Sequence, residues 1–399
     1  MSWEYVTLDK LGTISRGRSK HRPRNDKTLF SGKYPFVQTA DVKAAELYLT
    51  EYTDTYNERG LEQSKLWKAG TLCITIAANI ADTAILGIDA CFPDSIMGFI
   101  PYDGISNVKF VKYAFDILQR DCQKISQGTA QDNLSWKKLS TIKFPAPPIE
   151  VQERIVAILS VYDDLIENNK KQIKLLEETA QRLYKEWFID LLFPGYEDTP
   201  IVDGVPEGWI YKTVGEFGEV ITGKTPATSK TEYYGGDIPF VTIPDMHGKI
   251  YPLTTEKSLT KIGANTQKSK YLPPNTVIVS CIATVGLVNI AVEECQTNQQ
   301  INSVILSNEN DLYFFYESML RIKSLLDGVG SNGATMTNVN KMKFSNIKIL
   351  YPSDDLIVLF DKICVPIFDK ILALSKTVLK LQQARDRLLP KLMSGEIEV

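Results

Sequence analysis

The feature that most constrains this 399-residue sequence is an internal repeat. Four blocks of sequence recur in the second half in the same order, at offsets of 204 to 206 residues. The paired blocks are Trp3–Arg18 with Trp209–Lys224, Pro35–Asp41 with Pro239–Asp245, Leu72–Ile76 with Val277–Cys281, and Gly128–Leu134 with Gly333–Val339. Four matches in register indicate a duplication. Because a solenoid repeat is far shorter, each half is predicted to form one globular domain followed by one long helix.

The pattern within each half is typical of a strand-rich α+β domain. Short β-branched runs such as Cys73–Ile76 and Val277–Val279 alternate with Gly, Pro and Asn. The most apolar stretch, Val277–Val292, is too short for a membrane span and is interpreted as buried strands. The predicted organisation is a first domain over residues 1–147, a helix over 148–190, a linker over 191–208, a second domain over 209–352 and a second helix over 353–399.

Both predicted helices carry apolar residues at the heptad spacing of a coiled coil. Asn169 and Arg385 are polar exceptions in this pattern. The residues expected at the contact between the helices are Leu159, Ile166, Ile173, Leu176, Leu183, Ile371, Leu374, Val378, Leu381 and Leu388. The alternative is that each helix packs only on its own domain. The coiled coil is favoured because both halves have the same stripe.

The direction of the predicted coiled coil follows from the order of the segments. The first helix leads from the first domain to the second, so the second helix can bury its stripe only by running back along the first. We therefore expect an antiparallel pair, each helix of 40 residues being about 60 Å long. Pro366 is expected to kink the second helix, which should fray after Leu389 because of Pro390. Asp163 and Asp164 are interpreted as part of a solvated helix face.

Composition argues against several kinds of site. The two histidines cannot form a histidine-rich metal site, and the six cysteines are scattered without a C-x-x-C pair. The cysteines are therefore expected to be free thiols of a cytoplasmic protein, and no metal is expected. The start of the chain has no apolar core of a signal peptide. No Rossmann glycine turn and no amino-methyltransferase or nuclease motif is evident.

Two similar domains joined by a stiff spacer suggest recognition of two sites on one long ligand, for which DNA is the natural candidate. The net charge is −3, so any DNA-binding surface must be local. The first domain has such a cluster, formed by Arg16, Arg18, Lys20, Arg22, Arg24 and Lys27. Cations in a loop can neutralise phosphates or contact guanine edges. A solvated basic loop is the alternative.

The second domain offers polar candidates at corresponding places. Asn and Gln side chains suit adenine edges, although both are also ordinary turn residues. The candidates for DNA binding are Lys224, Thr225, Lys230, Tyr233, Tyr234, Gln299, Gln300 and Asn302. Two small polar loops near the ends of the domains add Gln127, Thr129 and Gln131 in the first half and Asn332 and Thr335 in the second. On sequence grounds, these two loops could equally be ordinary connecting loops that do not bind DNA.

One motif invites a different interpretation. Gly218–Thr225 formally satisfies the G-x-x-x-x-G-K-T pattern of a phosphate-binding loop. The preceding residues do not predict a strong buried strand, and Pro226 stands where the phosphate-binding helix should continue. The first half has glycines at the matching positions, Gly12 and Gly17. The glycines are therefore assigned to the repeat, and nucleotide hydrolysis is not expected.

Taken together, these residues resemble the specificity subunit of type I restriction-modification systems. The strongest likeness lies in Gly223–Pro226 and Tyr233–Val241 with Asp245, followed by Phe144–Leu159, Asn168 and Trp187–Phe188. The likeness covers essentially the whole chain. The start of the second helix departs from the family pattern, with Asp354–Ile357 in place of a Pro…Gln start.

The resemblance implies a non-catalytic DNA reader of two target recognition domains and two spacer helices. Each domain would read one half of an asymmetric, bipartite target, and the helices would set the gap of unread base pairs. Two methyltransferase subunits carrying S-adenosylmethionine would dock on the chain, and two ATP- and Mg-dependent motor-nuclease subunits could join them. Two other classes stay open: a scaffolding protein with two protein-binding domains, and a self-contained methyltransferase or nuclease. An assembly that only methylates is also open.

Overall fold

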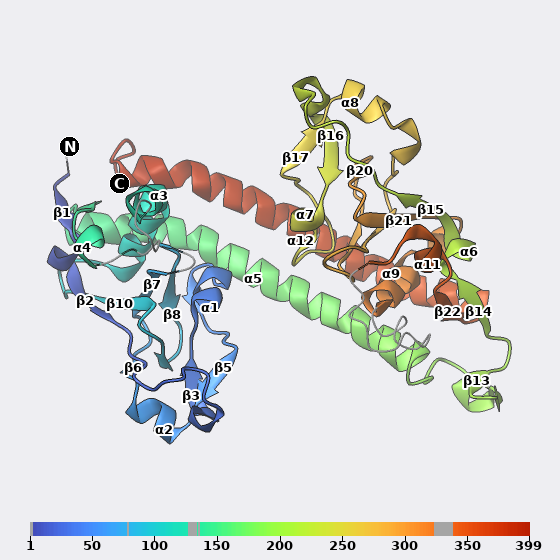
Figure 1. Cartoon of the computed structure of the whole chain (residues 1–399), viewed down its shortest axis with the longest axis horizontal. Helices are drawn as coiled ribbons and strands as arrows, with labels where there is room; N and C mark the ends of the chain where they lie inside the picture. Colours follow the sequence, from blue (N-terminus) through green and yellow to red (C-terminus); the bar gives the residue numbers. More distant parts are fainter. Residues whose placement is uncertain (1–2, 78–79, 127–133, 135, 323–337) are drawn as a thin grey trace. The chain divides into compact units, whose positions relative to one another are not determined.

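The computed structural model describes residues 3–77, 80–126, 134, 136–322 and 338–399. The chain divides into two compact units (Figure 1): unit 1 consists of Met1–Glu167 with Lys380–Val399, and unit 2 consists of Asn168–Leu379. The two longest helices, α5 (Ile149–Phe188) and α12 (Asp354–Met393), each have 40 residues and contribute to both units. The C-terminal segment is thus part of the same unit as the N-terminal domain.

The described residues of unit 1 form three sheets. A five-stranded sheet has the order β2-β10-β7-β8-β4, a four-stranded sheet has the order β5-β3-β9-β6, and β1 pairs with β11. The strands are β1 (Tyr5–Thr7), β2 (Gly12–Arg16), β3 (Phe30–Phe36), β4 (Tyr48–Leu49), β5 (Asp54–Tyr56), β6 (Leu66–Trp67), β7 (Leu72–Thr75), β8 (Thr83–Leu86), β9 (Ala90–Cys91), β10 (Ile96–Pro101) and β11 (Lys143–Pro145). The shorter helices are α1 (Thr39–Ala44), α2 (Glu58–Glu62), α3 (Val108–Ser126) and α4 (Trp136–Leu139).

Unit 2 repeats this plan. Its sheets have the orders β15-β21-β18-β19 and β17-β16-β20, with β14 paired to β22 and β12 to β13. The strands are β12 (Ile201–Val202), β13 (Val205–Pro206), β14 (Ile210–Thr213), β15 (Gly218–Thr222), β16 (Tyr234–Val241), β17 (Lys257–Leu259), β18 (Val277–Ser280), β19 (Val288–Ile290), β20 (Gln296–Thr297), β21 (Ile301–Leu306) and β22 (Lys348–Tyr351). The shorter helices are α6 (Val214–Phe217), α7 (Ile243–Met246), α8 (Lys261–Asn265), α9 (Leu312–Leu320) and α11 (Lys341–Ser345).

The strand register confirms the internal repeat. β3 pairs with β5 antiparallel and with β9 parallel, and β16 pairs with β17 antiparallel and with β20 parallel. Both antiparallel pairs shift register at matching places, between Phe30 and Tyr34 and between Tyr234 and Ile238. The two halves therefore share irregularities as well as strand order, and the predicted α+β class is confirmed.

The repeated aspartate after each Pro-Phe-Val motif caps the first turn of a helix. Asp41 accepts a hydrogen bond from the backbone N–H of Gln38 at 2.7 Å, and Asp245 accepts one from the backbone N–H of Thr242 at 2.8 Å. These are capping boxes, which satisfy amides that a helix leaves unpaired at its first turn. The motif therefore fixes a strand-to-helix turn in both halves.

The apolar stretch Val277–Val292 forms two buried strands, as predicted. Val277, Val279 and Ile290 lie in the main core of unit 2 together with Phe314, which belongs to α9. The core of unit 1 has the same plan, because Leu72 and Ile74 of β7 pack with residues of α3. All six cysteines are free and buried, so the expectation of free thiols is confirmed.

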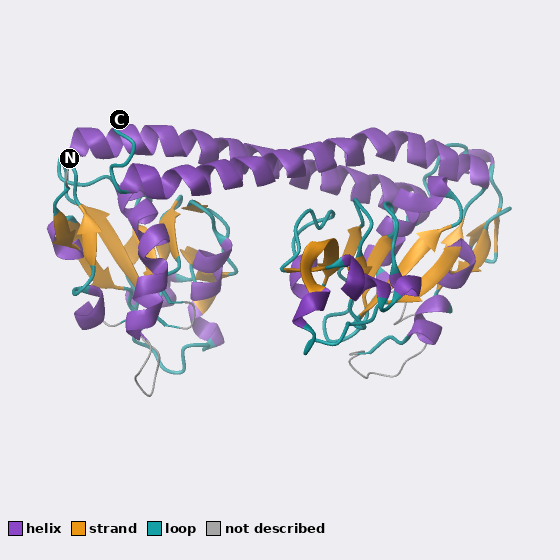
Figure 2. Cartoon of the chain, turned by 90° about the horizontal axis from the view of Figure 1, so that it is seen from above, coloured by secondary structure: helices purple, strands orange, loops and turns teal. Residues whose placement is uncertain are grey.

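Within each unit, opposite ends of the two long helices lie together beside the sheets (Figure 2). In unit 1, Ile155 and Leu159 of α5 share a core with Leu392 of α12. In unit 2, the rings of Phe188 and Phe360 lie 5.0 Å apart. The start of one helix thus packs with the end of the other, which confirms the antiparallel pairing. The ten residues predicted at this contact are all buried or half-buried.

Two expectations about the helices are wrong. Asp163 does not lie on a solvated face: it is buried, accepts a hydrogen bond from Tyr113 and is paired with Arg385, while Asp164 is exposed. The helix α12 does not end after Leu389 but continues to Met393. Burial of Leu392 and Met393 in the core of unit 1 holds this last turn in place. The same helix passes through Pro366 as one unbroken element.

Candidate nucleic-acid interface

The basic cluster of unit 1 begins at Arg16, the last residue of β2, and continues along a loop whose backbone is fixed. Gly17 N–H donates to the carbonyl oxygen of Ile96 at 2.8 Å, and Arg18 N–H donates to the carbonyl oxygen of Phe92 at 3.0 Å. A Cβ atom on Gly17 would lie 2.3 Å from the carbonyl oxygen of Pro93, so only glycine fits there. The loop therefore follows β10 closely, and the side chain of Arg18 is exposed.

The six predicted cations of this loop are all exposed, but they are not equivalent. Arg24 forms an ion pair with Asp94 at 2.6 Å, and Arg22 donates to the backbone oxygens of Ser19 and His21, both at 2.7 Å. The other four have no ion-pair partner within the part of the chain that the structure describes; they are Arg16, Arg18, Lys20 and Lys27. These four are free to contact an external anion.

The single acid within the loop is occupied by local contacts. Asp26 accepts hydrogen bonds from the backbone and hydroxyl of Thr28 at 2.9 and 2.8 Å, and His21 Nε2 lies 2.8 Å from it. These hydrogen bonds, led by that from the Thr28 backbone, lower the pKa of Asp26. Asp26 therefore stabilises the turn as a carboxylate instead of neutralising the neighbouring cations.

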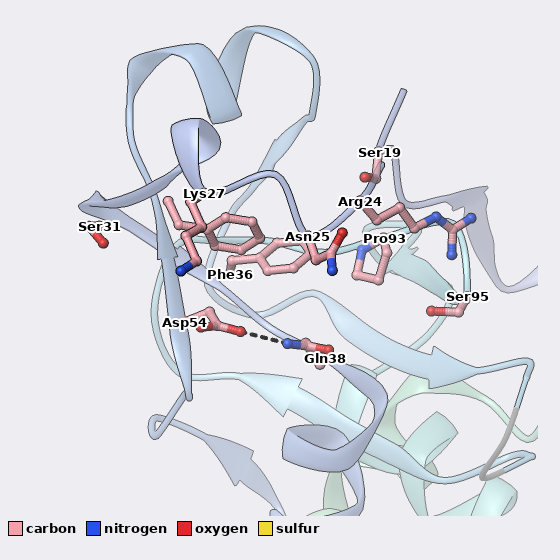
Figure 3. Close-up of a pocket in the computed structure, with 11 residues that line it drawn as sticks. Ser19, Arg24, Asn25, Lys27, Ser31, Phe36, Gln38, Asp54, Pro93 and Ser95 are labelled. Carbon is pink, nitrogen blue, oxygen red and sulfur yellow. Dashed lines mark hydrogen bonds between the residues drawn. The ribbon is translucent and has the colours of Figure 1, made fainter. Parts of the chain in front are cut away.

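A groove of about 510 Å³ opens beside the basic loop (Figure 3). Arg24, Asn25 and Lys27 line it from the loop, Asp54 lines it from β5, and Gln38 lines it from the start of α1. Gln38 Nε2 donates to Asp54 Oδ2 at 2.6 Å. The rings of Phe30 and Phe36 also line the groove. Cations, amides, a carboxylate and aromatic rings thus share one concave surface.

Unit 2 fixes its corresponding loop in the same way. Gly223 N–H donates to the carbonyl oxygen of Ile301 at 3.1 Å, and Lys224 N–H donates to that of Thr297 at 3.0 Å. A Cβ atom on Gly223 would lie 2.2 Å from the carbonyl oxygen of Asn298. Thr225 Oγ1 donates to Gln299 Oε1 at 2.6 Å. The structure therefore brings together Lys224, Thr225 and Gln299, three of the predicted residues.

Other predicted residues of unit 2 support this loop. The hydroxyl of Tyr234 donates to the carbonyl oxygen of Pro226 at 2.8 Å, and Asn298 Nδ2 donates to Gln300 Oε1 at 3.1 Å. Lys230 is exposed and lies 3.8 Å from Glu232, and Tyr233 is half-buried. The hydrogen bond from Tyr234 thus stabilises the conformation of this loop.

Asn302 is placed where it cannot serve as predicted. Its side chain is 2% exposed, accepts a hydrogen bond from Thr222 at 2.7 Å and donates to the carbonyl oxygen of Val339 at 3.2 Å. Both hydrogen-bonding groups of the Asn302 amide therefore have partners within the fold, and we do not retain Asn302 as a candidate DNA contact. The predicted residues Gln127, Thr129, Gln131, Asn332 and Thr335 lie outside the described residues.

Of the residues that line the groove, sequence reasoning predicted only Arg24 and Lys27, and the polar residues that it missed include Asn25, Gln38 and Asp54. Gln38 follows a repeated motif, but only the pairing of Phe36 with Asp54 brings Asp54 to the same edge. In unit 2 the corresponding strand pair joins Phe240 to Lys257, and Thr242 follows in place of Gln38. The two domains therefore present different chemistry at matching positions.

The phosphate-binding interpretation of Gly218–Thr225 is excluded by the fold. Residues Gly218–Thr222 form β15, which pairs with β21 over its whole length. A phosphate-binding loop instead cradles the anion with free backbone amides before a helix. Among the described residues, no group of three or more His, Cys, Asp or Glu side chains could hold a metal ion. Over the same residues, no helix combines the length and apolarity needed to span a bilayer.

Comparison with known proteins decides the family. The family model described as "Type I restriction modification DNA specificity domain" matches residues 1–178 and again residues 206–382. This chain belongs to that family. It is a non-catalytic specificity subunit of a type I restriction-modification system, which confirms the resemblance found in the sequence. The two matched ranges correspond to the two halves of the repeat.

Two curated relatives illustrate the membership, and one solved structure shows the same fold. The chain is 34% identical over 325 residues to the type I restriction enzyme HindI specificity subunit of Haemophilus influenzae, covering 66% of this chain and 71% of the relative. It is 25% identical over 413 residues to the MjaIX specificity subunit of Methanocaldococcus jannaschii, covering 100% and 94%. The S subunit from M. genitalium has the same fold, with a TM-score of 0.59 at 17% identity over 98% of this chain and 96% of that one.

Proposed function

We propose that each domain of this specificity subunit reads one half of an asymmetric, bipartite DNA target. The observation that carries the proposal is the pair of equivalent loops that begin at Gly17 and Gly223. Their backbones are fixed by the same two hydrogen bonds, while their side chains and the neighbouring sheet edges differ. A common scaffold with different side chains is what two domains need in order to read two different sequences.

Contacts to phosphates and to bases fall to different residues in this proposal. The unpaired cations Arg16, Arg18, Lys20 and Lys27 of unit 1, and Lys224 of unit 2, neutralise phosphates and set the register. Gln38 and Asp54 in the groove, and Thr225 and Gln299 in unit 2, contact base edges. Amides suit adenine, and a carboxylate accepts from the amino group of cytosine. Tyr233 and Lys230 extend the second surface.

The long helices set the number of unread base pairs between the two half-sites in this proposal. Each has 40 residues, about 60 Å at the rise of an α-helix. They also dock the methyltransferase subunits. Ile158, Val161 and Leu165 on α5 are exposed apolar side chains, and so are Leu359 and Ile363 on α12. Ile158 and Ile363 occupy matching positions in the repeat, which favours two equivalent docking surfaces and two methyltransferase subunits.

Catalysis would belong to these partners in the cytoplasm. The methyltransferase subunits would carry S-adenosylmethionine and flip out the target adenine. Two restriction subunits, using ATP and Mg, complete the proposed assembly.

The experiment is co-expression of this chain with its methyltransferase partner, followed by mapping of N6-methyladenine over a genome. We expect one asymmetric motif made of two short sequences separated by a fixed unread gap. A second strain carries unit 2 of a relative joined to unit 1 of this chain, and only one half of the motif should change. A contiguous motif, or methylation that does not depend on this chain, would refute the proposal.

A further inference from the structure

The two long helices correspond position by position at an offset of 205 residues. α5 and α12 begin at Ile149 and Asp354, and both have 40 residues. Buried residues of α5 coincide with buried residues of α12, as in the pairs Ile155 with Phe360 and Leu159 with Cys364. Each helix can therefore be compared with the other at every contact.

The pairing of the two helices has the same register in both units. In unit 1, Asp163 of α5 contacts Arg385 of α12. In unit 2, Phe188 of α5 contacts Phe360 of α12. Asp163 and Phe188 are 25 residues apart on α5, and Phe360 and Arg385 are also 25 residues apart on α12. With this register Ala180 lies opposite Phe368, and both are fully buried in the core of unit 2.

One position of this contact differs in character between the two units. In unit 1 it holds charges: Asp163 accepts from Arg385 Nη1 at 2.8 Å and from the hydroxyl of Tyr113, and Asp163 is only 6% exposed. At the offset of 205 residues, Asp163 corresponds to Phe368 and Arg385 corresponds to Ala180. Unit 2 therefore has an apolar pair at this position, with the ring of Phe368 stacked on Tyr313 at 4.2 Å.

The difference matters because the two halves are similar, so that two first halves or two second halves from different chains could also pair. Two first halves from two chains would place each Asp163 opposite Ala180, and the buried carboxylate would lose its cation. Two second halves would place each Arg385 opposite Phe368, within an aromatic cluster, and only the exposed neighbour Asp386 would remain as its anion. A buried charge without its partner is strongly unfavourable. Only pairing of a first half with a second half gives Asp163 its cation and Arg385 its buried anion.

We propose that the pair formed by Asp163 and Arg385 makes the two halves of this chain select each other and reject pairing of identical halves. The partner recognised by each helix is thus the other half of the chain, and rejection rests on the unpaired charge that the wrong pairing would bury. The consequence for DNA rests on the proposed function: two different domains read an asymmetric target, whereas two identical domains would read a symmetric one.

The test uses the full chain with a protease site inserted between Asp203 and Gly204, in the exposed turn joining β12 to β13. The purified chain is cut, the pieces are dissociated in mild denaturant and reassembled, and native mass spectrometry counts the three possible pairs. Random pairing gives twice as many mixed pairs as pairs of either identical kind. For the unchanged sequence we expect the mixed pairs to exceed this random ratio by about tenfold or more.

Two single substitutions should abolish the preference. With Arg385→Ala, Asp163 lacks a cation in mixed pairs and in pairs of first halves, so the pairings become equivalent and the random ratio is expected. Asp163→Ala leaves Arg385 with only its exposed neighbour Asp386 as an anion, both in mixed pairs and in pairs of second halves, so the random ratio is again expected. The charge-reversed variant with Asp163→Arg and Arg385→Asp should restore the preference.

A matched control is Glu396→Gln, which breaks the exposed contact of Glu396 with Lys391 near the end of the same segment and should leave the ratio unchanged. The full chain of each variant is purified before cutting, so that a variant that does not fold can be identified and set aside. The variants that fold then test the proposal. A near-random ratio for the unchanged chain, or an unchanged ratio for Arg385→Ala, would overturn the proposal. No DNA is used, so this result is independent of whether the two domains read DNA as proposed.

Discussion

The backbone N–H of Lys224 donates a hydrogen bond to the carbonyl oxygen of Thr297 at 3.0 Å, and the Lys224 side chain is exposed. The loop is thus fixed while its cation points away from the fold. If Lys224 contacts a phosphate, Lys224→Ala should weaken DNA binding about equally for target and non-target sequences. The slope of log K against log salt should fall by about one.

This expectation is checked by titrating the assembled methyltransferase complex with DNA at several salt concentrations. Lys391→Ala at the end of α12 is the control, because Lys391 is exposed and lies far along the chain from the loop. Loss of binding to the target alone, with an unchanged salt slope, would instead assign Lys224 to a base contact.

Gly223 should not tolerate a side chain. The Cβ of an alanine there would lie 2.2 Å from the carbonyl oxygen of Asn298, so the loop must move away from its strand. We expect Gly223→Ala to lower the free energy of unfolding by about 1–3 kcal/mol and to weaken methylation at the target. Gly215→Ala is the control, because its nearest neighbours would lie at 3.5 Å, an ordinary contact distance. Equal melting temperatures for the two variants would contradict this account.

The groove of unit 1 should specify only one half-site. Gln38→Thr combined with Asp54→Lys gives this groove the residues found at the matching positions of unit 2. Methylome mapping should then show an altered first half-site, with the second half-site and the gap unchanged. Asp89→Asn, which removes an exposed carboxylate that pairs with Lys68, is the control. A change in both half-sites would mean that the groove acts on the whole assembly.

Lengthening both helices should widen the unread gap. Seven residues inserted between Lys171 and Gln172, and seven between Lys376 and Thr377, keep the heptad pattern at positions that match in the antiparallel register. The added length is about 10 Å, close to three base pairs of DNA. Methylome mapping should report both half-sites unchanged and separated by about three more base pairs. Altered half-sites with the original gap would contradict the role of the helices as a spacer.

Glu317 makes the stability of unit 2 depend on pH. It is buried in α9, and burial with the nearby charge of Glu177 raises its pKa to about 8. The folded state therefore holds a proton that the unfolded state has lost above about pH 4.5, and stability falls as the pH rises from about 4.5 to 8. Glu317→Gln should remove this dependence.

The measurement is the melting temperature of the chain and of Glu317→Gln between pH 5 and pH 8. The advantage of the variant should grow steadily toward pH 8. Glu309→Gln at the surface of the same unit supplies the control. Parallel melting curves for the chain and for Glu317→Gln would show that Glu317 is already ionised when folded.

The sequence predicted the parts of this molecule that depend on periodicity. The repeat, the strand-rich domains and the heptads of the helices all follow from spacing, and the structure confirms them. Spacing does not show which polar side chain turns inward. Arg385 was an exception in the heptad and Asp163 a surface charge, and only the packing of α3 against the helices brings them together with Tyr113.

The candidate interface was predictable where it lies on one loop. The cations from Arg16 to Lys27 are neighbours in sequence, so their clustering needed no fold. Gln38 and Asp54 lie close together because β3 pairs with β5, and no pattern in the sequence around either residue predicts this pairing. Asn302 was predicted to bind DNA because it lies beside other amides in the sequence. That neighbourhood does not show that Asn302 belongs to β21 and that its side chain is buried in the core.

The assignment of residues 380–399 to unit 1 has a consequence for how the chain matures. Leu389, Leu392 and Met393 pack in the core of the first domain, yet they lie more than two hundred residues after the last strand of that domain, β11. During synthesis the ribosome therefore releases a first domain whose apolar surface stays uncovered until more than two hundred further residues have emerged. The core of the first domain is therefore complete only after the C-terminal part of α12 has been synthesised.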